Sequence, residues 1–215
     1  MCRHCNLSYP NFLDWKQRNV VFSSFAVYRS RTANLATPAR PQPFGGARVS
    51  YEFLRTLGVD ALMGRDFTQD DDLPSAPHAV ILSYASWQQR YASRHDIVGQ
   101  PVTLNGEPYN IIGVLQREFH FAPVGQPEFW MAYQPSADCG TRRDCRDLYG
   151  VARLKDGISM QAAEANVAAI AAQLQKEYPD ANNGQGAALT PLSESIVGDI
   201  RPILLVLMSG AGLCC

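Results

Sequence analysis

Cysteine offers the most reactive chemistry in this 215-residue sequence. The six cysteines form three close pairs: Cys2 with Cys5, Cys139 with Cys145, and Cys214 with Cys215. The first pair has the C-x-x-C spacing of half a zinc site and includes His4, but the other half would have to come from the wider-spaced Cys139 and Cys145. We therefore interpret the terminal pairs as chain ends and predict no metal site. Cys139 and Cys145 either form a small-loop disulfide, which needs an oxidising compartment, or remain free thiols.

Carboxylates and imidazoles give weaker signals. Asp70, Asp71 and Asp72 could bind a divalent cation, but they lack the spaced ligands of a calcium loop, so a solvated turn containing an N-cap is the preferred interpretation. The four histidines are far apart in the sequence: His4, His78, His95 and His120. An enzyme would need distant residues to converge, and a histidine beside the three aspartates would indicate one. We assign no catalytic residue.

Motifs for nucleotide binding and nucleophilic catalysis are missing from the sequence. It contains no G-x-x-x-x-G-K-[ST] loop, G-x-G-x-x-G turn, G-x-S-x-G elbow or H-E-x-x-H helix. We therefore expect no ATP binding, no cofactor and no enzymatic activity. The 19 basic and 20 acidic residues give a formal net charge of -1, so nucleic acid is excluded as a partner.

Three tryptophans could line a ligand groove. These are Trp15, Trp87 and Trp130. Aromatic residues at helix or strand spacing belong more often to the core, which is the preferred interpretation. Trp87 and Trp130 are kept as candidate contacts between lobes or with a ligand.

The first half of the sequence alternates between helix and strand patterns. Ser8 can cap a helix that has Pro10 in its first turn and ends near Asn19. Period-2 alternation predicts a strand over 25–35, and "PFGGARVS" predicts another. Ser50 is then expected to cap a short helix that Gly58 ends in the left-handed conformation.

The second half contains the clearest local signals. "HAVILS" predicts a strand and Ser83 the cap of the next helix, while Asn105-Gly106 predicts a type I′ hairpin turn. "LYGVARL" predicts a later strand. The longest helix should begin after Ser159, and Pro179 should stop it. Its apolar stripe, for packing on a sheet, is Met160, Ala163, Val167, Ile170, Leu174 and Tyr178. One more short strand is expected before the C-terminal apolar run.

The run from Pro202 to Cys215 has no charged residue. A membrane span needs roughly 20 apolar residues, whereas about 10 to 14 are more typical of a buried helix. The run alone therefore fits either a core helix or the first part of a transmembrane helix.

Six segments together carry a family resemblance. In order they are "LSYPNFLDWKQRNVVFSSFAVY", "VSYEFLRTLGVDALMGRDFTQDDD", "AVILSYASWQQRY", "IVGQPVTLNGEPYNIIGVL", "VARLKDGISMQAAEANVAAIAAQLQKEYPD" and "PLSESIVGDIRPILLVLM". They resemble the MacB-like periplasmic core domain of FtsX-related ABC transporter permeases, in particular the large orphan permeases common in acidobacteria. The resemblance runs from about residue 7 to residue 208.

The resemblance implies a two-lobed α+β domain. Residues 1–62 and 146–198 would form a porter-like α/β lobe, and residues 63–145 a β-rich, sabre-like insert. In this family one transmembrane helix precedes the domain and others follow it. Residues 199–215 would thus begin a truncated transmembrane helix, the chain would be a fragment, and the missing first helix would explain why the N-terminus has no export signal.

The family also implies a function. The domain would lie on the periplasmic side of the bacterial inner membrane and couple ATP-driven motion of the transmembrane helices to export of a substrate. Its partners would be the rest of the permease, a separate ATPase, a periplasmic adaptor and, through the C-terminal segment, the membrane. The alternative is a periplasmic ligand- or peptide-binding module, which a large apolar cavity lined by Trp87 or Trp130 would favour.

Overall fold

The computed structural model describes residues 6–36 and 42–197. The strands are β1 (Leu7–Ser8), β2 (Phe22–Leu35), β3 (Gln42–Val49), β4 (Ala61–Gly64), β5 (Ala79–Leu82), β6 (Pro101–Leu104), β7 (Glu107–Leu115), β8 (Phe129–Ala132) and β9 (Arg146–Leu154). The α-helices are α1 (Tyr9–Arg18), α2 (Phe53–Leu57), α3 (Tyr84–Tyr91), α4 (Met160–Glu177), α5 (Pro179–Asn182) and α6 (Leu192–Val197). Three short 3-10 helices are η1 (Gln69–Asp72), η2 (His95–Ile97) and η3 (Ala122–Val124).

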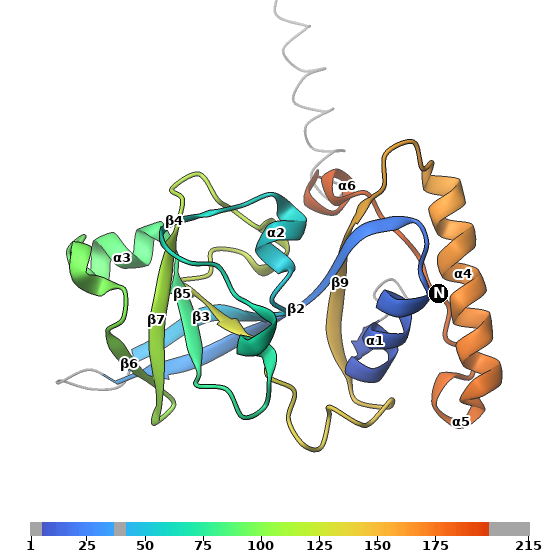
Figure 1. The fold of residues 1–215 in the computed structure, drawn as a ribbon, viewed down its shortest axis with the longest axis horizontal. Helices are drawn as coiled ribbons and strands as arrows, with labels where there is room; N and C mark the ends of the chain where they lie inside the picture. Colours follow the sequence, from blue (N-terminus) through green and yellow to red (C-terminus); the bar gives the residue numbers. More distant parts are fainter. Residues whose placement is uncertain (1–5, 37–41, 198–215) are drawn as a thin grey trace, which may run out of the picture.

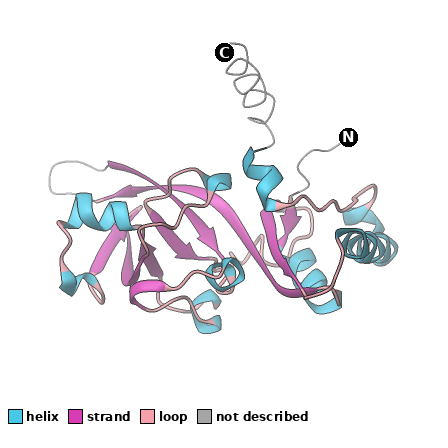
Figure 2. Ribbon diagram, turned by 90° about the horizontal axis from the view of Figure 1, so that it is seen from above, coloured by secondary structure: helices cyan, strands magenta, loops and turns pink. Residues whose placement is uncertain are grey.

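The strands form one nine-stranded mixed sheet that the long strand β2 holds together. Its order is β1-β9-β2-β3-β8-β5-β7-β4, and β6 pairs with both β2 and β7. From Phe22 to Tyr28, β2 pairs with β9, and from Tyr28 to Leu35 it pairs with β3. We call the part with β1, β9, α1, α4 and α5 the helix-covered half, and the part with β3 to β8, α2 and α3 the β-rich half. Strand β2 runs through both (Figures 1 and 2).

The helix-covered half is built from helices far apart in the sequence. Ser8 caps α1 and Ser159 caps α4, each by accepting a backbone N–H three residues on. Phe12 of α1 and Val167 of α4 then pack in one core with Leu148 of β9. The predicted docking of both helices on a common sheet is therefore confirmed.

The β-rich half has a core on each face of its sheet. Under α3 the core contains Trp87, Phe44 and Phe129, and on the opposite face Trp130 packs with Phe53. Phe129 and Trp130 follow each other on β8, and successive side chains of a strand point to opposite faces of the sheet. The two residues therefore belong to different cores.

The β6–β7 hairpin turns as its sequence predicts. Asn105 and Gly106 have φ angles of 53° and 83°. Positive φ at both central positions is the type I′ geometry, whose twist matches that of the two strands. The hairpin prediction is confirmed.

Three local predictions are wrong. Ser50 does not cap α2, whose N-cap is Glu52, because its hydroxyl instead accepts the backbone N–H of Val27. The segment before residue 198 is the helix α6 and not a strand. The solvated turn is wrong for Asp71, which is buried in a capping box with Thr68, although Asp70 is exposed.

The division into lobes at residues 62 and 146 stays a prediction. The segment from β3 to α2 lies before that boundary, yet Phe53 packs against Trp130 with ring centroids 5.4 Å apart. The two lobes of the prediction thus share a core as well as a sheet.

Some predictions fall outside the described residues. They concern the N-terminal Cys2, His4 and Cys5 and the C-terminal run from residue 199. Among the residues that the structure describes, no helix combines the length and apolar character that crossing a membrane requires.

Candidate functional site

The sequence-predicted tryptophans are both core residues. Trp130 is 1% exposed and Trp87 6% exposed, and they pack in separate cores on opposite faces of the β-rich half. Trp87 Nε1 donates to the carbonyl of Arg94 at 2.8 Å. The structure therefore does not bring the two side chains together.

The predicted acidic and imidazole groups do not converge either. In residues 6–36 and 42–197, no hydrogen bond or ion pair joins a histidine to the three aspartates of η1. The same residues contain no cluster of histidine, cysteine and carboxylate groups that could hold a metal ion.

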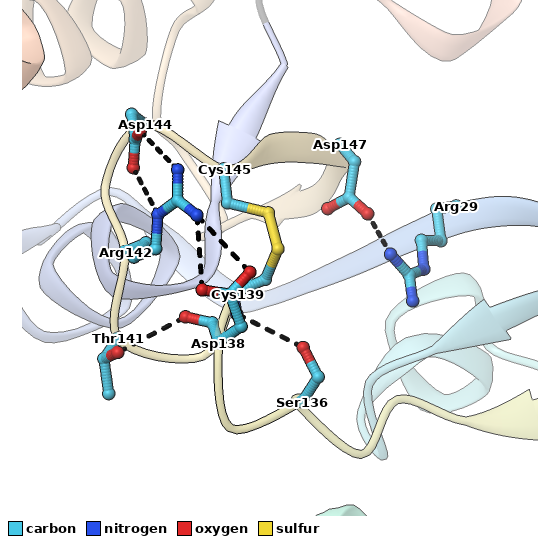
Figure 3. Close-up of a disulfide and its surroundings, with 9 residues drawn as sticks. All are labelled: Arg29, Ser136, Asp138, Cys139, Thr141, Arg142, Asp144, Cys145 and Asp147. Carbon is cyan, nitrogen blue, oxygen red and sulfur yellow. Dashed lines mark hydrogen bonds and ion pairs between the residues drawn. A yellow bond between two sulfur atoms is a disulfide. The ribbon is translucent and has the colours of Figure 1, made fainter.

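A disulfide lies in the connection between the two halves. Residues 133–145 lead from β8 to β9, and Cys139 and Cys145 are joined with their Cα atoms 5.4 Å apart. Figure 3 shows the small loop that they close, in which Arg142 pairs with Asp138 and Asp144. The connection therefore reaches β9 through a covalently closed turn.

Arg143 projects from this loop onto α1. Its Nη1 lies 2.6 Å from Asp14 Oδ2 and donates to Asn11 Oδ1 at 2.6 Å. The guanidinium also covers the ring of Tyr178, 3.6 Å from its centroid. Asn11 in turn donates to Asn182 of α5 at 2.7 Å. One arginine thus joins the connecting loop to α1 and to the end of α4.

The other side of α1 contacts the β-rich half. Lys16 Nζ lies 2.8 Å from the Glu52 carboxylate and donates to the hydroxyl of Tyr51 at 3.4 Å. Burial lowers the pKa of Lys16, but its contacts with Glu52 and Tyr51 outweigh burial and hold the pKa above its ordinary value. Near the start of the helix, Tyr9 stacks on Tyr133 just after β8, at 5.3 Å between centroids.

Helix α1 therefore contacts both halves of the molecule. We call its contacts with the β-rich half and with residues 133–145 the junction. At the other end of the described chain, α6 lies against η3 of the β-rich half, and Figure 1 shows it between α2 and α4. The first and last described helices both lie near the boundary between the halves.

Comparison with known sequences places the chain in a family. The profile described as MacB-like periplasmic core domain matches residues 7–170. The chain belongs to this family.

Solved structures agree with the fold of this MacB-like domain. The periplasmic region of MacB from Actinobacillus actinomycetemcomitans has a TM-score of 0.62 at 15% identity, over 84% of this chain and 78% of that one. The extracellular domain of the ABC-type transporter YknZ from Gram-positive bacteria has a TM-score of 0.59 at 16% identity, over 81% and 85%. No curated protein sequence matches the chain. The α+β family fold expected from the sequence is thus confirmed, with one large mixed sheet and several helices.

The sequence did not predict the junction of the MacB-like domain. Lys16, Glu52 and Arg143 carry no motif, and charged residues at these positions are equally typical of a solvated surface. Only the apolar stripes of α1 and α4 indicated that distant segments would meet.

A half-buried carboxyl group lies at the edge of the junction. Asp72 Oδ2 accepts the backbone N–H of Tyr51 at 2.9 Å, while Asp72 Oδ1 is buried without a hydrogen-bond partner. Burial raises the pKa of Asp72 to about 6, although the backbone N–H groups of Tyr51 and Tyr133 favour the charged form. Burial likewise raises the pKa of Asp66 to about 6.

Asp72 should make the MacB-like domain less stable as pH rises. Its pKa is raised in the folded state, so between about pH 4 and pH 6 the folded chain binds more protons than the unfolded chain and stability falls with increasing pH. Asp72→Asn should reduce the loss of unfolding free energy between pH 4 and pH 7 by ~2 kcal/mol. Urea unfolding at several pH values measures this, with the exposed Asp70→Asn as control. An unchanged slope would contradict the assignment.

Proposed function

We propose that this chain is a non-catalytic coupling domain of an ABC transporter permease. It transmits ATP-driven movement of transmembrane helices to the export of a substrate on the periplasmic side of the bacterial inner membrane. Its partners are the remaining transmembrane helices of the permease, a separate ATPase and a periplasmic adaptor. Membership of the MacB-like family supports the periplasmic location in a permease, and the junction supports the coupling of movement.

The observation that carries the proposal is the double contact of α1. Its apolar face packs against the other elements of the helix-covered half, and its Lys16 pairs with Glu52 of the β-rich half. A displacement of α1 therefore acts on both halves at once. Packed elements move as units because close-packed cores deform little, and motion concentrates at polar contacts that can break and re-form.

A charge exchange at the junction tests the proposal in the complete permease, assembled with its ATPase. Lys16→Glu places two carboxylates opposite each other and should weaken the coupling between ATP hydrolysis and transport by about fivefold or more. The double variant Lys16→Glu/Glu52→Lys should restore it. Transport and stimulated ATPase activity in reconstituted vesicles are the two readouts.

The control is a charge change away from the junction. Glu164→Lys alters an exposed position of α4 and should leave coupling unchanged. If Lys16→Glu folds and inserts normally but transports as well as the unchanged protein, the junction does not transmit the movement.

A groove favours a second candidate, a ligand- or peptide-binding module. It has a volume of about 220 Å³ and lies between β2–β3 and the segment before β8, lined by Ser30, Arg31, Thr32, Gly45, Gly46, Val124, Gln126 and Pro127. A side chain added at Gly45 would meet open space. Gly45→Trp should therefore fill the groove without disturbing the fold. If it abolishes transport while Lys16→Glu has no effect, binding in the groove is the function.

A further inference from the structure

Three arginines lie together on one face of β2 and β3. Residues directly opposite in an antiparallel pair share a face of the sheet, as do residues two apart on a strand. Arg29 lies opposite Arg48, and Arg31 is two residues from Arg29. On the same face of β2, Val27 belongs to the core of the helix-covered half and Ala33 to the core under α3. The three side chains, which we call the arginine cluster, thus lie between two apolar cores.

The cluster is not neutralised. Asp147 forms an ion pair with Arg29, as Figure 3 shows, and leaves two positive charges. Within the described part of the chain, no carboxylate forms an ion pair with Arg31 or Arg48. The Nε atoms of Arg29 and Arg48 are buried without a hydrogen-bond partner. Like charges directly opposite on a sheet are destabilising, so this arrangement costs stability in the free protein.

Two of the three guanidinium groups in the cluster contact aromatic side chains. Arg48 Nη2 donates to the hydroxyl of Tyr109 at 3.4 Å, and the Arg29 guanidinium lies over the ring of Tyr133, 5.4 Å from its centroid. Both tyrosines are buried. Arg31 is exposed, so the cluster remains open to solvent. Burial and the neighbouring Arg48 and Arg31 lower the pKa of Arg29 below its ordinary value.

We propose that the arginine cluster binds a phosphate group. The planar guanidinium donates pairs of N–H groups that match phosphate oxygens, and a phosphate monoester carries a charge of about −1.5 to −2 at neutral pH. That charge balances the two positive charges left by Asp147. The site therefore suits a phosphate carried by a small molecule or by a lipid headgroup. This binding is independent of the coupling role proposed above.

Calorimetric titration of the 215-residue chain tests the site. Inorganic phosphate and glycerol 3-phosphate, each added at low ionic strength, should show saturable binding at one site. Arg48→Gln and Arg31→Gln should each weaken it about tenfold or more, since each removes a charge-assisted hydrogen bond. Arg142→Gln is the matched control, because Arg142 is exposed and already paired with Asp138 and Asp144.

Thermal unfolding separates a binding role from a structural one. Without phosphate, Arg48→Gln should unfold at the same or a higher temperature than the unchanged chain, because a like-charge pair is removed. Phosphate should raise the melting temperature of the unchanged chain but not that of the variant. If Arg48→Gln unfolds at a lower temperature, the exposed Arg31→Gln decides between the two roles by its phosphate affinity.

Vesicles distinguish the source of the phosphate group. Arg48-dependent binding to phosphatidate vesicles, whose headgroup is a phosphate monoester, and not to phosphatidylcholine vesicles, would assign a lipid headgroup. Binding of glycerol 3-phosphate alone would assign a small molecule. The proposal is overturned if none of these probes binds saturably, or if binding is unaffected by both Arg31→Gln and Arg48→Gln.

Discussion

Replacing Trp130 by alanine should lower the free energy of unfolding by about 3 to 5 kcal/mol. Its indole is 1% exposed and packs against Phe53, Phe119 and Phe121 at centroid distances of 5.4, 5.4 and 6.5 Å. Removal leaves a cavity that strand β8, paired on both sides, cannot collapse to fill. Urea unfolding followed by circular dichroism measures the loss.

Trp130→Phe is the matched control. It keeps an aromatic ring in the core and removes the indole N–H, which has no hydrogen-bond partner. Phenylalanine is smaller than tryptophan, so this exchange leaves a smaller cavity than alanine does and should cost less than the alanine exchange. Should alanine cost no more than phenylalanine, the packing described for this core would be incorrect.

Replacing Val167 by aspartate should lower the free energy of unfolding by about 3 to 5 kcal/mol at neutral pH, as expected for an uncompensated buried charge. Val167 is fully buried where α4 packs on the sheet beside α1. Protonation removes the charge, and burial raises the pKa of a carboxyl group in such a site, so the loss should shrink at acid pH. Denaturant unfolding at pH 7 and near pH 4 provides both values.

Ala168→Asp places the same side chain on the next residue of α4, at an exposed position. It controls for the added charge and for the low helix propensity of aspartate, and should cost no more than about 0.7 kcal/mol, the propensity difference from alanine. Equal losses for the two variants would mean that α4 does not dock through the face of Val167. Loss of α4 docking would also release α1, since both helices share one core, and the junction would lose its support.

The sequence alone determined the helix caps and the hairpin turn, because interactions between neighbouring residues stabilise them. Ser8, Ser83 and Ser159 each cap a helix, because a hydroxyl that accepts an N–H three residues on needs no partner from elsewhere. Asn105-Gly106 forms the hairpin turn because few other residues tolerate its positive φ angles. Six segments in order also sufficed to indicate the MacB-like family.

Predictions failed where a side chain bonds to a group far away in the sequence instead of to a neighbouring residue. Ser50 has the sequence context of a helix cap, yet its hydroxyl accepts the N–H of Val27 on β2. The aspartates of η1 look like a surface turn, yet Asp72 accepts the backbone N–H of Tyr51, 21 residues away in the sequence. Their surroundings depend on strand pairing, which no short sequence window contains.

The junction and the arginine cluster were decided by the tertiary structure alone. Arg143 of the loop before β9 reaches Asp14 of α1, far away in the sequence, and Arg29 lies opposite Arg48 because β2 pairs with β3 beyond the part that pairs with β9. A one-residue change of register in β2 would move Arg29 and Arg31 to the other face of the sheet, away from Arg48. The apolar pattern fixed which faces are buried, whereas the register fixed which charges meet.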